Sequence, residues 1–221
     1  MYKTMTYEKF CKRVSVNLDG NHRCSLLCPN CPRQTKYTNF GKKVAGKDIS
    51  MKDYDKVIKH FHHINFEGQY SDPVHHPKFI EILKLLREQR ISCSVHNASS
   101  AKSEDWYIKA FEANPRAHWL FGIDGLPDES CMYRINQDGE FLFEMAKLCA
   151  KMCRRSVWQY IVFSYNENHI DEAIDLANKH GIHFEINFST RWKGKNDIYR
   201  PRNELLYKKR PEQWKILKKH Y

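Results

Sequence analysis

Short apolar runs typical of β-strands alternate with amphipathic helical patterns along most of the 221-residue chain. The strand-like runs cover residues 13–18, 63–67, 91–95, 117–123, 156–163 and 183–188. The helical patterns cover residues 50–61, 77–89, 103–114, 140–153 and 166–180. Because a helix between two strands returns the chain to the same end of the sheet, these strands must run parallel. The sequence therefore predicts an α/β fold built from six β/α repeats.

Six strands are too few to close the eight-stranded parallel barrel. We therefore expect a partial (β/α)6 barrel, an open parallel sheet with helices on its outer face. Ligands of such sheets bind at the carboxyl ends of the strands. The loops that follow the strands are thus where functional residues should be sought.

The loop after the first expected strand contains the stretch "RCSLLCPNCPRQ", with Cys24, Cys28 and Cys31 spaced C-x3-C-x2-C. The N-terminal residues lack the apolar region of a signal peptide, and no apolar run is long enough to cross a bilayer. We therefore expect a soluble, cytoplasmic protein with no membrane partner, in which thiols stay reduced. Three thiolates are too few to close a zinc site, but they can hold three irons of a [4Fe–4S] cluster. One iron then stays open, as a catalytic site requires.

The loops after the later strands carry four further motifs in a fixed order. They are "FEGQYSDPVHHPKF" at 66–79, "VHNAS" at 95–99, "FGIDGLPDESCMYRI" at 121–135 and "YIVFSYNENHIDEAIDLANKHGI" at 160–182. With the cysteine triplet, these motifs resemble the radical S-adenosylmethionine (radical SAM) superfamily. The chain is similar to the short members of that superfamily encoded by bacteriophages.

The resemblance implies an enzyme with one [4Fe–4S] cluster on Cys24, Cys28 and Cys31, and S-adenosylmethionine (SAM) chelated to the open iron. Such an enzyme cleaves SAM reductively to a 5′-deoxyadenosyl radical, which abstracts hydrogen from the substrate. A reductant such as flavodoxin or ferredoxin would supply the electron.

The resemblance also implies which residues bind SAM. They are Gly68, Asp72, Asn97, Asp124, Arg134 and Asn166. The backbone from Gly68 to Asp72 would receive the amino group of SAM, and Arg134 would face its carboxylate. Asn97, Asp124 and Asn166 would hydrogen-bond the ribose or nearby groups. Three positions depart from the usual pattern, with Asp72 in place of Glu, Ala98 in place of Gly and Gly122 in place of Ser.

We divide the chain into a radical SAM core at 1–190 and a basic C-terminal tail or helix at 191–221. The tail carries eleven Lys or Arg residues against three acidic residues, so +8 of the formal net charge of +11 lies there. Aromatic residues interleave with these cations, a composition that suits nucleic-acid binding as well as a solvated helix packed on the core. The substrate is therefore left open between a peptide or protein side chain and a nucleotide or nucleic acid. A non-catalytic nucleic-acid-binding module with a structural metal is the alternative from another functional class.

Overall fold

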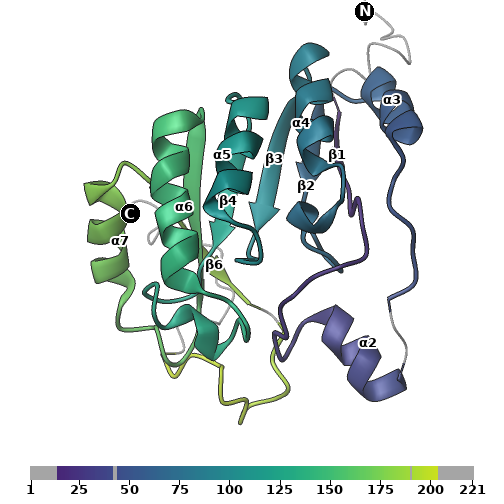
Figure 1. Ribbon diagram of the computed structural model, residues 1–221. Helices are drawn as coiled ribbons and strands as arrows, with labels where there is room; N and C mark the ends of the chain where they lie inside the picture. The colour runs from purple at the N-terminus through teal and green to yellow at the C-terminus, as the bar shows by residue number, and fades with distance from the viewer. Residues whose placement is uncertain (1–13, 42–43, 190, 204–221) are drawn as a thin grey trace, which may run out of the picture.

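A computed structural model describes residues 14–41, 44–189 and 191–203, and in these residues one parallel sheet forms the centre of the molecule (Figure 1). The strand order is β1-β2-β3-β4-β5-β6, so each strand pairs with the next one in the sequence. The strands are β1 (Ser15–Asn17), β2 (His63–Phe66), β3 (Ser92–Asn97), β4 (His118–Gly122), β5 (Arg155–Val162) and β6 (His183–Phe188). The predicted partial (β/α)6 barrel is confirmed.

The helices between the strands are also close to the ranges predicted from the sequence. They are α3 (Met51–His60), α4 (Phe79–Glu88), α5 (Glu104–Ala113), α6 (Gly139–Met152) and α7 (Ile170–Lys179). Three of them begin at a residue whose side chain accepts a hydrogen bond from a first-turn backbone N–H, namely Ser50, Ser103 and Asp138. These caps fix the helix starts because the first N–H groups of a helix have no partner within it.

One helix was not predicted, α2 (Pro32–Phe40), which begins directly after Cys31. It is short and mostly polar, so its sequence shows no apolar periodicity. Its first residue is a proline, which is well suited to the first turn of a helix. Two short 3-10 turns, η1 (Pro73–His75) and η2 (Ser130–Met132), lie in the loops after β2 and β4.

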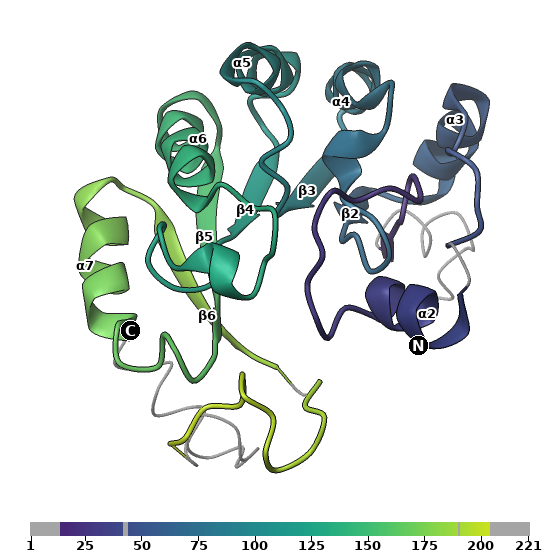
Figure 2. The ribbon, with the colours of Figure 1, turned by 60° about the horizontal axis from the view of Figure 1, so that its bottom comes forward.

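The hydrophobic core lies between the sheet and helices α3 to α7, which are arranged along the convex face (Figure 2). Alternate strand residues point to this layer, among them Phe66, Trp119 and Trp158, all essentially fully buried. Trp119 packs edge-on against Phe79 of α4 with ring centroids 6.3 Å apart. Truncating an aromatic residue in such a core costs about 3–5 kcal/mol, so this layer supplies much of the stability.

The concave face of the sheet has a different composition. The side chains there include His63, Asn65, Ser94 and His96, all half-buried rather than buried. The two ring nitrogens of His63 lie 2.7 Å from Ser92 Oγ and 2.7 Å from Asn65 Oδ1. The interior of a closed parallel barrel is usually packed with Val, Ile and Leu. This polar face is therefore not a packed core, and it is available to water or a ligand.

Residues 191–203, here called the C-terminal strap, are the described part of the predicted basic tail. Trp192 and Tyr199 pack against Phe163 at the end of β5, and Tyr199 also contacts Tyr133. Asn30 of the cysteine loop donates a hydrogen bond to Asp197 of the strap at 3.2 Å. The strap thus joins the end of the sheet to the cysteine loop. The rest of the predicted tail, 204–221, lies outside the described residues.

Among the described residues, the model contains no helix with the length and apolar character that a membrane span requires.

Candidate functional site

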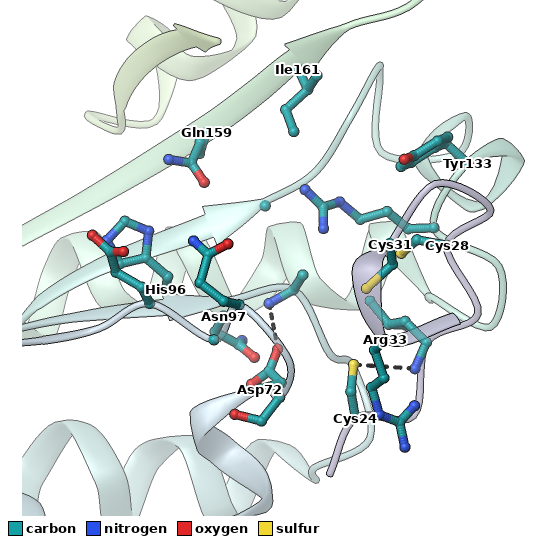
Figure 3. Close-up of a pocket in the computed structure, with 18 of the residues that line it drawn as sticks. Cys24, Cys28, Cys31, Arg33, Asp72, His96, Asn97, Tyr133, Gln159 and Ile161 are labelled. Atoms are coloured by element: carbon teal, nitrogen blue, oxygen red, sulfur yellow. Dashed lines mark hydrogen bonds between the residues drawn. The ribbon is translucent and has the colours of Figure 1, made fainter. Parts of the chain in front are cut away.

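A cavity of about 380 Å³ opens at the carboxyl edge of the sheet, where the fold predicts a site (Figure 3). Seven of the nine residues proposed from the sequence line it. They are Cys24, Cys28, Cys31, Gly68, Asp72, Asn97 and Arg134. The three cysteines lie at one side of the cavity, and His96 and Gln159 lie at the other side. The loops after several strands therefore converge on one space.

The cysteine loop is held in a compact turn by its own backbone. Cys31 N–H donates to Cys28 O at 3.1 Å, and the Leu26 N–H approaches Cys24 Sγ at 3.4 Å. Every cysteine of the described residues is a free thiol. Burial raises the pKa of the Cys24 thiol to about 12, to which the nearby Asp72 also contributes. Burial likewise raises the pKa of Cys28 to about 11.

Buried thiols of this kind become thiolates when a metal binds, because the metal charge replaces the lost hydration. In the described residues, no three His, Cys, Asp or Glu side chains converge on the position of a single ion. Three thiolates that each bind a different iron do not need to converge on one point. Three free cysteine thiols on one loop are a donor set that would suit three corners of an iron–sulfur cluster.

Gly68 and Asp72 shape the loop after β2. Gly68 has φ +62°, and a Cβ there would collide with the carbonyl oxygen of Ser71, so only glycine fits this turn. The side chain of Asp72 accepts backbone N–H bonds from Ala98 and Ser99, both at 2.8 Å, and from Val74 at 3.2 Å. The loop is thereby tied to the end of β3.

Asp72 also reaches the cysteine loop through its backbone. Its N–H donates to Arg23 O at 2.8 Å, next to Cys24, and its O accepts from Asn21 Nδ2 at 2.9 Å. Burial raises the pKa of the Asp72 carboxyl to about 6, although its three backbone hydrogen bonds act to lower it. Asp72 therefore connects two loops at the edge of the cavity that it lines.

Asn97 lies at the end of β3 and is 1% exposed. Its Nδ2 donates to the Tyr107 hydroxyl at 2.7 Å, which in turn donates to Ser99 O, so the amide orientation is fixed. Its Oδ1 has no hydrogen-bond partner. A buried acceptor without a partner is costly, and this one lines the cavity. A ligand with an N–H or O–H donor would satisfy it.

Arg134 lines the cavity from the loop after β4, and it is held there by Asp124. Arg134 Nε lies 2.7 Å from Asp124 Oδ2, and the Asp124 side chain is fully buried. The other Asp124 oxygen accepts from Ile161 N at 2.9 Å. Burial raises the pKa of Asp124, against the opposing effect of Arg134. The loop that carries Arg134 is bonded to the cysteine loop, because Leu27 N–H donates to Ile135 O at 3.1 Å, and the guanidinium acts to lower the pKa of Cys28.

The departure at Gly122 has a physical reason. A Cβ at this position would lie 2.9 Å from Arg134 Nη2 and 3.1 Å from Arg134 Cζ. The guanidinium therefore occupies the space that a serine side chain would fill. Glycine at 122 and arginine at 134 form one structural unit.

Two of the proposed residues do not line the cavity, Asp124 and Asn166. Asp124 acts through Arg134, as described above. Asn166 is fully buried in the turn after β5, where its Oδ1 accepts from Phe163 N at 2.7 Å and its Nδ2 donates to Ile161 O at 3.0 Å. Its side chain is thus engaged by the turn itself.

Other cavity residues were not selected from the sequence. His96, Leu120, Gln159 and Ile161 lie at the concave face of β3, β4 and β5. Burial lowers the pKa of His96, and a hydrogen bond with Gln159 acts in the opposite direction. The sequence does contain a signal for His96 and Gln159, because each is a polar residue within a strand that is otherwise mostly apolar.

The fold has counterparts among solved structures. Streptococcus suis SuiB bound to S-adenosylmethionine is 11% identical, with a TM-score of 0.70 over 93% of this chain and 47% of SuiB. The match to native anSMEcpe with bound AdoMet has 16% identity and a TM-score of 0.63, over 84% of this chain and 55% of that one. TYW1 with a lysine-pyruvate adduct bound is 12% identical, with a TM-score of 0.62 over 98% and 78% of the chains.

These structural neighbours are radical SAM enzymes, and the partial barrel is the feature that this chain shares with them. The chain spans less than half the length of the SuiB structures that it matches. No protein-family model matches the sequence, and no curated protein matches it at a significant level.

Proposed function

We propose that this protein is a radical SAM enzyme that binds one [4Fe–4S] cluster and cleaves SAM reductively to abstract hydrogen from a substrate. The observation that carries this proposal is the convergence of three free cysteine thiols of one loop on the same cavity as Gly68, Asn97 and Arg134. The fold shared with SAM-bound structures supports it.

In this proposal Cys24, Cys28 and Cys31 hold the cluster. A cluster held by these thiolates would supply the electron for reductive cleavage of SAM, and hydrogen abstraction from the substrate would follow. Arg134, kept cationic and oriented by Asp124, faces the carboxylate of SAM. Asn97 Oδ1 accepts a hydrogen bond from the bound SAM, which satisfies its buried oxygen.

Other residues position this machinery. Asp72 fixes the cysteine loop relative to β3, and Gly68 allows the tight turn of the loop after β2 that lines the cavity. A flavodoxin or ferredoxin would supply the electron.

The test is anaerobic reconstitution of the full chain with iron and sulfide, followed by SAM and dithionite. We expect about four iron and four sulfide per chain, together with 5′-deoxyadenosine and methionine in equal amounts. About one zinc per chain without sulfide would instead support the non-catalytic alternative with a structural metal. A fully loaded protein that binds SAM but forms no 5′-deoxyadenosine would contradict the proposed chemistry.

A further inference from the structure

The two sides of the cavity differ in charge. Arg33 lies on α2, which begins directly after Cys31. Arg134 precedes Ile135, whose O accepts from Leu27 N at 3.1 Å, so both arginines line the cavity on the side of the cysteine loop. The opposite side is lined by Glu67 and by His96 and Gln159. Two cations therefore lie where negative thiolates would lie, whereas the far side carries the Glu67 carboxylate together with one cation, Arg191.

A second carboxylate, that of Glu185, lies on the same concave face of the sheet, beside the lining residue Gln159 but not itself in the cavity lining. Gln159 on β5 pairs directly with Glu185 on β6, and paired residues of parallel strands point to the same face of the sheet. Glu67 follows β2 directly, where Phe66 pairs with Val95, so it comes next to His96. Both Glu67 and Glu185 act on the pKa of His96, raising it against the lowering effect of burial. Both carboxylates thus share the concave face of the sheet with this imidazole.

These carboxylates have no partner of their own in the described residues: neither Glu67 nor Glu185 forms an ion pair or accepts a hydrogen bond there. Both side chains are half-buried. Arg191 also lines the cavity, and it donates a hydrogen bond to Gln69 Oε1 at 3.2 Å rather than to either carboxylate. Asn97 Oδ1 is also an acceptor without a donor, but the proposed function assigns it to SAM. The acceptors that remain for a substrate on this side are therefore the two carboxylates.

We infer that the far side of the cavity binds the substrate, and that the substrate presents a cationic amine or guanidine of a peptide side chain to Glu67 and Glu185. This inference rests on the proposed function for the identity of the enzyme, and it adds the chemical class of the substrate. Two half-buried carboxylates would repel a phosphate group, so a polynucleotide backbone does not fit this side. A lysine or arginine side chain supplies the donors that the acceptors lack.

The test measures binding in the anaerobically reconstituted full chain with SAM but without reductant, so that no turnover occurs. The probes are the N-acetyl N-methylamides of lysine, arginine, norleucine and glutamate, together with adenosine monophosphate. Isothermal titration gives each dissociation constant. We expect the lysine or arginine probe to bind in the millimolar range or better and about 10-fold more tightly than norleucine.

Variants locate the binding site of the probe. Glu185→Gln and Glu67→Gln should each weaken binding of the cationic probe about 10-fold, because a charge-assisted hydrogen bond is lost. Glu172→Gln, which removes the same charge from an exposed position of α7, should leave the affinity unchanged. The comparison of lysine with norleucine in the unaltered protein does not depend on the folding of any variant.

Three results would overturn the inference. They are equal affinity for lysine and norleucine, preference for adenosine monophosphate, and no binding of either cationic probe at millimolar concentration. Loss of SAM affinity in Glu67→Gln and Glu185→Gln, with probe binding retained, would also overturn it by assigning both carboxylates to the cofactor. Failure of the proposed function is seen separately, as a loaded protein that forms no 5′-deoxyadenosine with dithionite.

Discussion

Replacing Gly122 by alanine should destabilise the protein through Arg134. The new Cβ would lie 2.9 Å from Arg134 Nη2, closer than side chains normally pack. The guanidinium cannot move freely, because its side chain is only 14% exposed and it is paired at 2.7 Å with the fully buried Asp124. Inserting a methyl group into a packed site costs about 1–3 kcal/mol. Glycine-to-alanine replacement returns about 0.4–1 kcal/mol by restricting the unfolded chain.

The expected net loss is therefore about 1–2 kcal/mol in the free energy of unfolding. Urea unfolding of the metal-free, reduced protein, followed by tryptophan fluorescence, would measure it. The matched background is Arg134→Lys, which keeps a cation for Asp124 but lacks Nη2, the atom nearest to the new Cβ. In that background Gly122→Ala should cost clearly less.

The two backgrounds form a double-mutant cycle with an expected coupling energy of up to about 1–2 kcal/mol. Equal costs in both backgrounds would refute the reasoning, because the crowding would then come from atoms other than the guanidinium. Ala98 Cβ, at 3.3 Å from the same position, would be the next group to consider.

Three further results are expected. Cys28→Ala should lose the visible absorbance of the cluster and SAM cleavage together, whereas the buried Cys149→Ala should retain both and lose only about 1 kcal/mol of stability by urea unfolding. Burial and nearby cations lower the pKa of His75 from 6.5 to about 4 in the folded protein. The contribution of the neutral imidazole to the stability of the fold is therefore present above pH 6.5 and is lost as the pH falls toward 4. Between pH 7 and pH 5 the free energy of unfolding of the metal-free protein should therefore fall by about 1 kcal/mol more than that of the His75→Gln variant. This figure has been reduced by half because the imidazole is partly exposed. Asp197→Ala, which removes the acceptor of Asn30 Nδ2, should speed the loss of iron to a chelator several-fold in anaerobic absorbance measurements, and an unchanged rate would contradict this role of the strap.

The parallel sheet of six β/α repeats could be predicted because the spacing of apolar residues along the chain depends on which residues are buried. All six strands were predicted, since each has alternate residues packed on a helix layer. Helix α2 was not, because it is mostly polar and its position depends on the cysteine loop that precedes it. Local sequence patterns thus identify helices and strands that contribute residues to the core. They miss a helix such as α2, whose position depends on the loop that precedes it.

The candidate site was predicted unevenly for a similar reason. The spacing of the cysteines is a property of one loop and can be read directly. The pairing of Arg134 with Asp124 depends on how the loop after β4 folds back, and only the structure shows that Gly122 makes room for it. Asn166 was proposed from its place in a motif, but both ends of its amide are used by the turn after β5. Its role in SAM binding stays a prediction.

The residues of the far side of the cavity were not selected, because a polar residue in a strand is usually solvent-exposed. His96 and Gln159 become functional candidates only when the open barrel places them opposite the cysteines. An open sheet leaves its concave face for ligands, and the sequence alone does not show which alternate positions face it.

The contact between Asn30 and Asp197 has a consequence for the order in which the protein is made. The ribosome synthesises the cysteine loop first, and the strap begins 160 residues after Cys31, as 191 − 31 gives. At about 5–20 residues per second, this interval lasts about 8–32 s. During that time the hydrogen bond from Asn30 to Asp197 cannot form, so the cysteine loop lacks its link to the strap until synthesis is nearly complete.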